Sequence, residues 1–159
     1  MKHLKRLLKG PLKPVPTSLA IFLLVIALLG FADSTYLTIE HYKGVIPPCT
    51  IVSGCEAVLT STYSVVLGIP VSLLGAIYYF LILVGVFAYI EGRNEKLLRM
   101  ALLVTVLGFI FSMWFLIVQA FILQAWCLYC LISTGTSTIL FVTAVVIFSK
   151  YRTPDTLTS

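Results

Sequence analysis

Charged residues are scarce in this chain. Of its 159 residues, 11 are Lys or Arg and 6 are Asp or Glu, whereas 60% are hydrophobic and the mean hydropathy is +1.07. So few polar side chains cannot cover the surface of a water-soluble domain of this size, and the composition therefore excludes that class. The net charge of +5 does not then indicate nucleic acid as a partner, and the placement of the charges along the chain is the better guide.

Residues typical of hydrolytic sites are also scarce. His3 and His41 are the only histidines, and neither a Ser/His/Asp set nor a glycine-rich phosphate loop is evident. Asp33 is a carboxyl group within an apolar run, which makes it a functional candidate, although we expect it to lie near the outer interface, capped or hydrated. These features argue against hydrolysis and leave electron transfer through thiols, which requires none of these groups.

Long apolar runs are abundant. A hydrocarbon core of roughly 30 Å requires about 20 apolar residues per helix. The sequence predicts an all-α membrane protein, a four-transmembrane-helix bundle with a long extracytoplasmic loop between helices 1 and 2. The predicted spans are Thr17 to Thr38, Val65 to Ile90, Met100 to Leu123 and Cys127 to Phe148. Residues 1–16 form a basic amino-terminal segment, 17–150 the membrane domain and 151–159 a polar tail.

Ten of the eleven cationic residues fall on one side of this predicted topology, and only Lys43 lies in an opposite loop. The ten are Lys2, Lys5, Arg6, Lys9, Lys13, Arg93, Lys96, Arg99, Lys150 and Arg152. The positive-inside rule then places both termini in the cytoplasm and all four cysteines outside the cell membrane. A cleavable signal peptide ending near Gly30 and Ala32 is an alternative for the first run, and it would leave this sidedness unchanged.

The first outer loop, from Ile39 to about Ser64, carries Cys49 and Cys55. A helix would separate these residues by about 9 Å, which is more than a disulfide spans, so pairing requires an irregular loop. The segment "CEAVLTS" is predicted to be a short helix. The following span is expected to be capped by Ser61, Thr62 or Ser64 and to contain Pro70 near its start.

The second pair, Cys127 and Cys130, has a spacing that places both sulfur atoms on one face of a helix. The helix amino terminus stabilises a thiolate there, as disulfide exchange requires. Dithiol exchange between two outer pairs is the favoured interpretation, because disulfides persist outside the cell. Structural disulfides and a four-cysteine zinc site remain alternatives, and spacing alone allows three connectivities.

An electron acceptor for a thiol pair beside hydrocarbon has to be lipid-soluble, which favours a quinone. Aromatic residues near the Cys-x-x-Cys supply flat apolar surface, namely Phe111, Trp114, Phe115, Phe121, Trp126 and Tyr129. Because aromatic residues are common in any membrane protein, this support is weak by itself.

Several of these features together resemble the bacterial and archaeal homologues of vitamin K epoxide reductase, over Thr17 to Phe148. They are the outer loop with Cys49 and Cys55, Ser61 six residues further on, the entry "VLGIPVSLLGAIYY" and the motif "CLYC". The resemblance implies a four-helix bundle around a quinone, with Cys130 facing the quinone in a charge-transfer complex or adduct. It further implies that Cys55 attacks Cys127, that Cys49 exchanges with a thioredoxin-like or DsbA-like protein, and that Ser61 steadies the loop or hydrogen-bonds near the site.

The reaction implied is oxidation of the partner dithiol and reduction of menaquinone or ubiquinone, in support of disulfide formation in exported proteins. The DsbB family places its Cys-x-x-Cys in the first outer loop, and this chain has the reverse order. Animal enzymes that reduce vitamin K epoxide have an asparagine in the second helix and a tyrosine shortly after the Cys-x-x-Cys. Here the only asparagine is Asn94, and Ser133 and Thr134 follow the motif, which favours quinone over epoxide as substrate.

Many homologues carry a fused thioredoxin-like domain, and this sequence shows none, so a separate partner is expected. Two alternatives remain open at this point. The first is the reverse direction, a reductase of quinone or quinone epoxide. The second is a non-catalytic membrane subunit with structural disulfides.

Overall fold

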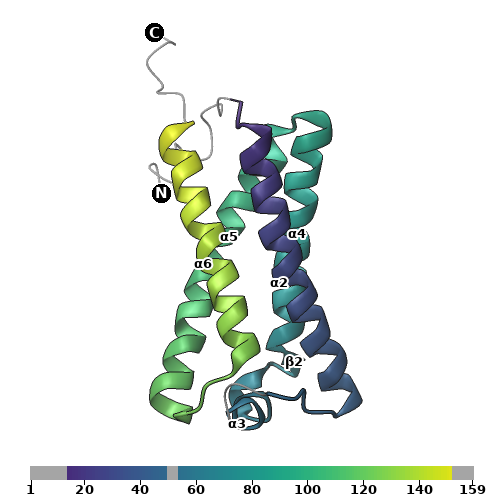
Figure 1. Cartoon of the computed structure of the whole chain (residues 1–159), viewed down its shortest axis with the longest axis vertical. Coiled ribbons are helices and arrows are strands. Elements are labelled where there is room, and N and C mark those ends of the chain that lie inside the picture. Colours follow the sequence, from purple (N-terminus) through teal and green to yellow (C-terminus); the bar gives the residue numbers. More distant parts are fainter. Residues whose placement is uncertain (1–13, 50–53, 152–159) are drawn as a thin grey trace.

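The structure, a computed structural model, describes residues 14–49 and 54–151. Four long helices dominate it: α2 (Thr17–Lys43), α4 (Val71–Gly92), α5 (Glu95–Ile117) and α6 (Leu128–Lys150). The π-helix η2 (Val118–Leu123) continues α5, and each of the four resulting helices is long and apolar enough to cross a membrane. The prediction of an all-α four-helix membrane protein is confirmed (Figure 1).

The two described ends of the chain lie at one end of the bundle, and α3 (Cys55–Leu59) lies at the other (Figure 1). Arg93, Lys96, Arg99 and Lys150 lie at or near the helix ends opposite α3. The basic residues predicted up to Lys13, and Arg152, fall outside the described ranges. The short helix predicted at "CEAVLTS" is confirmed as α3 and is followed by the 3-10 turn η1 (Thr62–Ser64).

The predicted start of the second span at Val65 is wrong. The strands β1 (Val65–Val66) and β2 (Ile69–Pro70) form an antiparallel hairpin there. Its two turn residues have positive φ, 53° at Leu67 and 81° at Gly68, as tight hairpin turns require. Pro70 is the amino-terminal cap of α4 rather than a residue of its first turn.

The expected cap by Ser61, Thr62 or Ser64 is also wrong. The Ser61 and Ser64 hydroxyl groups donate to the carbonyl oxygens of Val58 and Ser61, each at 2.7 Å, and so stabilise the loop itself.

Other helix bounds differ because hydropathy does not detect charged helix ends. Helix α5 begins at Glu95 instead of Met100, where the Asn94 side chain accepts the Leu97 N–H at 3.3 Å. Helix α2 continues to Lys43, where Gly44 ends it in the left-handed conformation. Helix α6 begins at Leu128, and Cys127 is its cap.

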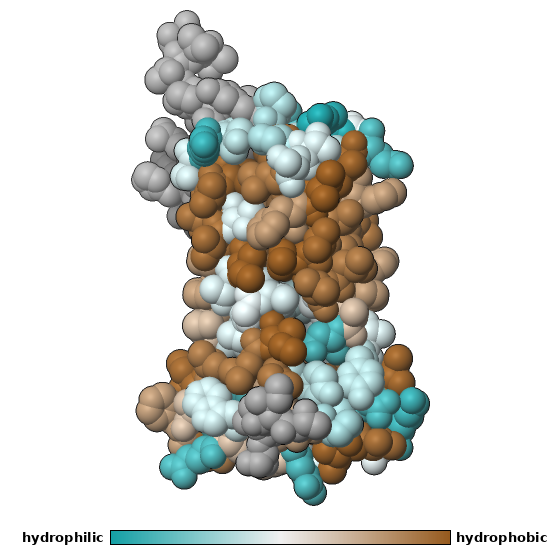
Figure 2. All heavy atoms as spheres, in the orientation of Figure 1, coloured by the Kyte–Doolittle hydropathy of each residue, from teal (hydrophilic) through white to brown (hydrophobic). Residues whose placement is uncertain are grey.

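The outer faces of the helices are apolar. Figure 2 shows hydrophobic residues over the helix walls and hydrophilic residues gathered mainly at the two ends. Large side chains such as Phe22, Leu28, Phe87 and Ile110 are exposed on those walls. This surface suits lipid as solvent, with backbone hydrogen bonds satisfied inside each helix.

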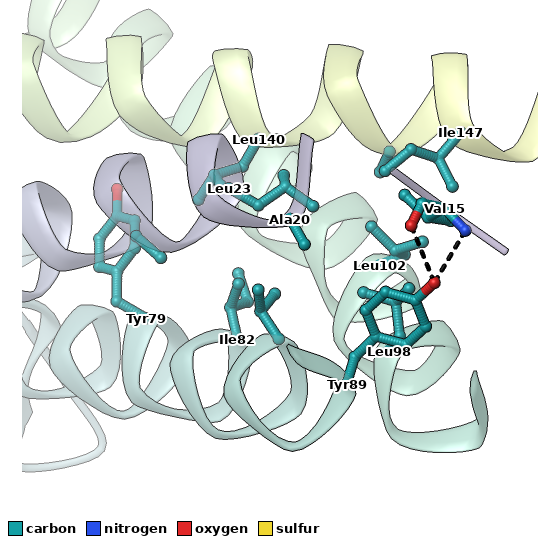
Figure 3. Close-up of a cluster of buried hydrophobic side chains, with 13 residues drawn as sticks. Val15, Ala20, Leu23, Tyr79, Ile82, Tyr89, Leu98, Leu102, Leu140 and Ile147 are labelled. Carbon is teal, nitrogen blue, oxygen red and sulfur yellow. Dashed lines mark hydrogen bonds between the residues drawn. The ribbon is translucent and has the colours of Figure 1, made fainter. Parts of the chain in front are cut away.

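The core occupies the half of the bundle away from α3 and joins all four helices (Figure 3). It includes Leu23, Ile82, Leu102, Leu140 and Ile147. The Tyr89 hydroxyl accepts the Val15 N–H at 2.8 Å and donates to the Val15 carbonyl at 3.0 Å, which ties the segment before α2 to α4. Gly30 lets the Tyr79 ring pack against α2, in keeping with the small residues typical of membrane helix contacts.

Candidate functional site

All four cysteines gather in one cluster at the α3 end of the bundle. Cys55 and Cys127 are buried at its centre with Val58, and Cys49 and Cys130 pack against them. The two pairs are about 70 residues apart in sequence, from Cys55 to Cys127. Both pairs were predicted to lie on one side of the membrane, and the fold brings them into contact.

The first pair, Cys49 and Cys55, is a disulfide with a Cα–Cα distance of 6.1 Å. Cys49 precedes α3 and Cys55 is its first residue, so the pair is not on one continuous helix, as the spacing required. Gly54, just before α3, has no room for a side chain, because a Cβ there would lie 2.5 Å from the Trp126 nitrogen and 2.8 Å from its carbonyl oxygen. This close approach holds Cys55 against the segment that carries the second pair.

The second pair, Cys127 and Cys130, consists of free thiols. The prediction that Cys127 is the first residue of the helix is wrong. Cys127 is the amino-terminal cap of α6, with φ −104° and ψ 120°. Its sulfur accepts the Cys130 N–H at 3.5 Å, in the position where Ser or Asp usually caps a helix. The predicted helix-terminus environment is present, although Cys127 lies before the helix rather than within it.

The pKa of the Cys127 thiol is lowered from its usual value. The main cause is the hydrogen bond from the Cys130 thiol, and the N–H groups of Cys130 and Tyr129 add to it. Burial and the charge of Asp33 oppose this effect and raise the pKa. A thiol with a lowered pKa forms the thiolate that disulfide exchange requires.

Gln119 is a site residue that the sequence analysis missed. It lies in η2, is fully buried, and its Oε1 accepts the Cys127 N–H at 3.0 Å. Its Nε2 is buried without a hydrogen-bond partner among the described protein groups. The signal in the sequence was a glutamine inside an apolar span, eight residues before the first cysteine of the motif.

A cavity of about 1080 Å³ extends from the second pair into the bundle. Of the predicted quinone contacts, Cys130, Ser61, Phe111 and Phe115 line it, together with Trp114. Its size is close to the upper end of ligand pockets, about 300 to 1,000 Å³, and most of its lining is apolar. The lining suits an apolar ligand, and Cys130 is the cysteine of the second pair that lines the cavity.

The other two predicted quinone contacts, Trp126 and Tyr129, do not line this cavity. The Tyr129 ring packs at 5.7 Å from that of Tyr36, and its hydroxyl donates to the Pro48 carbonyl at 3.3 Å. Trp126 presents its backbone to Gly54. Both residues contact the outer loop instead, Tyr129 through Pro48 and Trp126 through Gly54.

Among the described residues, the Asp33 carboxyl group has neither a capping hydrogen bond nor an ion pair. It is half-buried in α2, and its Oδ2 is buried without a hydrogen-bond partner among the described protein groups. The expected cap is therefore not present, and hydration of the carboxyl group at the outer interface stays a prediction. Within residues 14–49 and 54–151, no group of three or more His, Cys, Asp and Glu side chains is placed to hold a metal ion.

Comparison with known proteins agrees with this arrangement. The family model described as the vitamin K epoxide reductase family matches residues 21–145, which includes all four cysteines and the cavity. The chain belongs to the vitamin K epoxide reductase family. A search of curated proteins found no match. Membership in the vitamin K epoxide reductase family identifies the protein as a membrane oxidoreductase of a family that uses thiols and quinone.

Proposed function

We propose that this protein oxidises the dithiol of a thioredoxin-like partner and passes the electrons to a membrane quinone, so that disulfides form in exported proteins. The observation that carries the proposal is the contact between two cysteine pairs in different states, the disulfide Cys49–Cys55 and the thiols Cys127 and Cys130. Two redox pairs packed together allow thiol–disulfide exchange between them without a diffusing intermediary.

The partner reacts at Cys49, which is half-buried at the edge of the cluster, whereas Cys55 is 1% exposed. Attack there forms a mixed disulfide with Cys49 and releases the Cys55 thiol inside the cluster, and the partner's second thiol then frees Cys49. The Cys55 thiol attacks Cys127 of a disulfide between Cys127 and Cys130 and releases Cys130, and Cys49 then attacks Cys55, which restores the first disulfide and releases Cys127. The burial of Cys55 and Cys127 together at the centre of the cluster supports attack at Cys127.

The quinone, when bound in the cavity, accepts two electrons and two protons as the second pair forms its disulfide. Cys130 is the member of the pair that lines the cavity and contacts it, with Ser61, Phe111 and Phe115 among the surrounding walls. Gln119 holds the Cys127 backbone, which keeps the Cys127 sulfur next to Cys130. The apolar lining excludes water from the thiols.

Two further observations bear on direction and substrate. The cationic ends of α4, α5 and α6 are opposite the cysteine cluster, which by the positive-inside rule supports a position of the cysteines outside the cytoplasm. Asn94 caps α5 at that opposite end through the Leu97 N–H, so it offers no hydrogen bond to an epoxide in the cavity. The first observation favours disulfide formation in exported proteins, and the second favours quinone over epoxide as the substrate.

The test is quinone reduction by the purified chain, followed by absorbance. Ubiquinone-1 and menadione are the acceptors, and a reduced thioredoxin-like protein is the donor. We expect turnover in the wild type and none in Cys130→Ala. Ser149→Ala makes a change of similar size at the opposite end of α6 and should retain turnover.

Absence of turnover in folded wild-type protein, with both quinones and several donors, would contradict the proposal. Turnover that persists in Cys130→Ala would contradict the assignment of the second pair. In the first case the disulfide would be structural, and reduction of Cys49–Cys55 would be expected to lower stability by about 2 to 5 kcal/mol.

A further inference from the structure

Asp33 lies within a membrane-spanning helix, one turn after Gly30, where the Tyr79 ring crosses to α2 (Figure 3). The described residues provide no ion pair for Asp33, and its Oδ2 is buried without a hydrogen-bond partner among protein groups. Carboxyl groups inside a bilayer are costly to keep charged and commonly mark proton relays. Asp33 is therefore a candidate for a functional role.

The charge of Asp33 acts on groups from both helices that pack against α2. On α4 that group is Tyr79, and at the start of α6 the groups are Cys127, Tyr129 and Cys130. The carboxyl group is therefore close enough to the reactive dithiol to act on it electrostatically. Its effect on Cys127 is to raise the pKa of that thiol, because two negative charges close together are unfavourable.

Tyr79 connects this region to the cavity. Its hydroxyl donates to the Ser133 carbonyl at 2.8 Å and lies 2.8 Å from the Thr136 Oγ1. Tyr79 and Ser133 line the cavity, as does Cys130. Ser34, the residue after Asp33, lines the same cavity, so polar groups from α2, α4 and α6 lie on walls that are otherwise mostly apolar.

We propose that Asp33 holds the proton that Cys127 releases and returns it toward the quinone, an inference that rests on the proposed function. Formation of the Cys127–Cys130 bond breaks two S–H bonds and removes two electrons from the sulfur atoms. Both electrons leave for the quinone, one proton leaves directly from Cys130, and the other leaves by way of Asp33. A thiolate at Cys127 beside a charged Asp33 is unfavourable, so the proton that leaves Cys127 stabilises the pair when it resides on Asp33.

The test uses the full chain with Asp33→Asn and two separate readouts. The first is the pH dependence of Cys127 alkylation by iodoacetamide, measured in the Cys130→Ala background so that Cys127 is the free thiol. Loss of the Asp33 charge should move this titration to lower pH. The second is single-turnover reduction of ubiquinone-1 by the pre-reduced chain with both cysteines of the motif. Loss of the proton acceptor should slow it on the order of 100-fold.

The two expected changes have opposite consequences, which is what separates a proton-transfer role from a purely electrostatic one. More thiolate by itself would speed the reaction, so a slower reaction with more thiolate is specific to the proposal. Glu40→Gln is the matched control, since it neutralises another carboxylate of α2, which pairs with Lys43 at 3.2 Å on the surface. It should leave both readouts unchanged.

Asp33→Asn that reduces quinone as fast as the wild type would overturn the inference, as would an unchanged alkylation titration. Asp33→Glu restores a carboxyl group and should bring turnover to within about tenfold of the wild type, against the 100-fold scale above. A folded Glu variant as slow as Asn would assign a structural role and overturn the inference. If Asp33→Asn does not fold, Asp33→Ser replaces it with the same expectations.

Failure of the proposed function would give a different result. Wild-type turnover would then be absent, while the alkylation readout would still report on Asp33 and Cys127.

Discussion

The contact between α2 and α4 at Gly30 gives a quantitative prediction. A Cβ at this position would overlap the Tyr79 ring, lying 2.7 Å from Cδ1 and closer to the neighbouring ring atoms. Tyr79 cannot retreat freely, because its hydroxyl is held on α6 by Ser133 and Thr136, at 2.8 Å each. Overpacking costs about 1–3 kcal/mol, and a lost hydrogen bond adds about 0.5–1.5 kcal/mol. Because the gain in helix propensity offsets about 0.5–1 kcal/mol, Gly30→Ala should lower the free energy of unfolding by about 1–4 kcal/mol.

Thermal denaturation in detergent measures this change, and Gly135→Ala is the matched control. Gly135 is also inside a membrane helix, but nothing lies within 4 Å of a Cβ built there. That variant should be as stable as the wild type, or more stable by about 0.5–1 kcal/mol from helix propensity. A double variant with Tyr79→Leu makes room for the new methyl group, so the two changes should couple by about 1 kcal/mol or more. If Gly30→Ala is no less stable than Gly135→Ala, or if the double variant is additive, the explanation of this contact is wrong.

Three further predictions concern the cysteine cluster. The hydrogen bond from Cys130 is the main cause of the lowered pKa of Cys127, so Cys130→Ala should raise that pKa and move the alkylation of Cys127 to higher pH; a midpoint that stays or falls would contradict this. Maleimide labelling of the unfolded chain should modify two thiols, Cys127 and Cys130, without reductant and all four cysteines after reduction, and any other partition would refute the pairing. Gln119→Leu removes the acceptor of the buried Cys127 N–H, at 3.0 Å, and should cost about 1–3 kcal/mol of stability in thermal denaturation; a variant as stable as the wild type would show that this N–H finds another acceptor.

Hydropathy predicted the number of spans and their approximate centres because the bilayer imposes one length and one composition on every crossing helix. It failed at the ends, where charge and capping decide. Glu95 and Lys96 belong to α5, although a hydropathy window stops short of them. The hairpin at Val65–Pro70 was missed because its apolar residues continue directly into those of α4.

The site was predictable in chemistry but not in detail. Cysteine spacing indicated two redox pairs, and topology placed them on one side of the membrane. The cap position of Cys127 depends on the extended backbone after Gln124, a left-handed residue that no periodicity reveals. Aromatic composition also does not separate Phe111 and Phe115, which line the cavity, from Trp126 and Tyr129, which do not.

The burial of Cys127 has a consequence for selectivity. Its exposed fraction is 0%, and it lies in one apolar cluster with Cys55. In the proposed pathway, the cysteine of a folded partner protein cannot reach it directly. Electrons from such a partner then enter the quinone pool only through Cys49, the half-buried cysteine at the edge of the cluster.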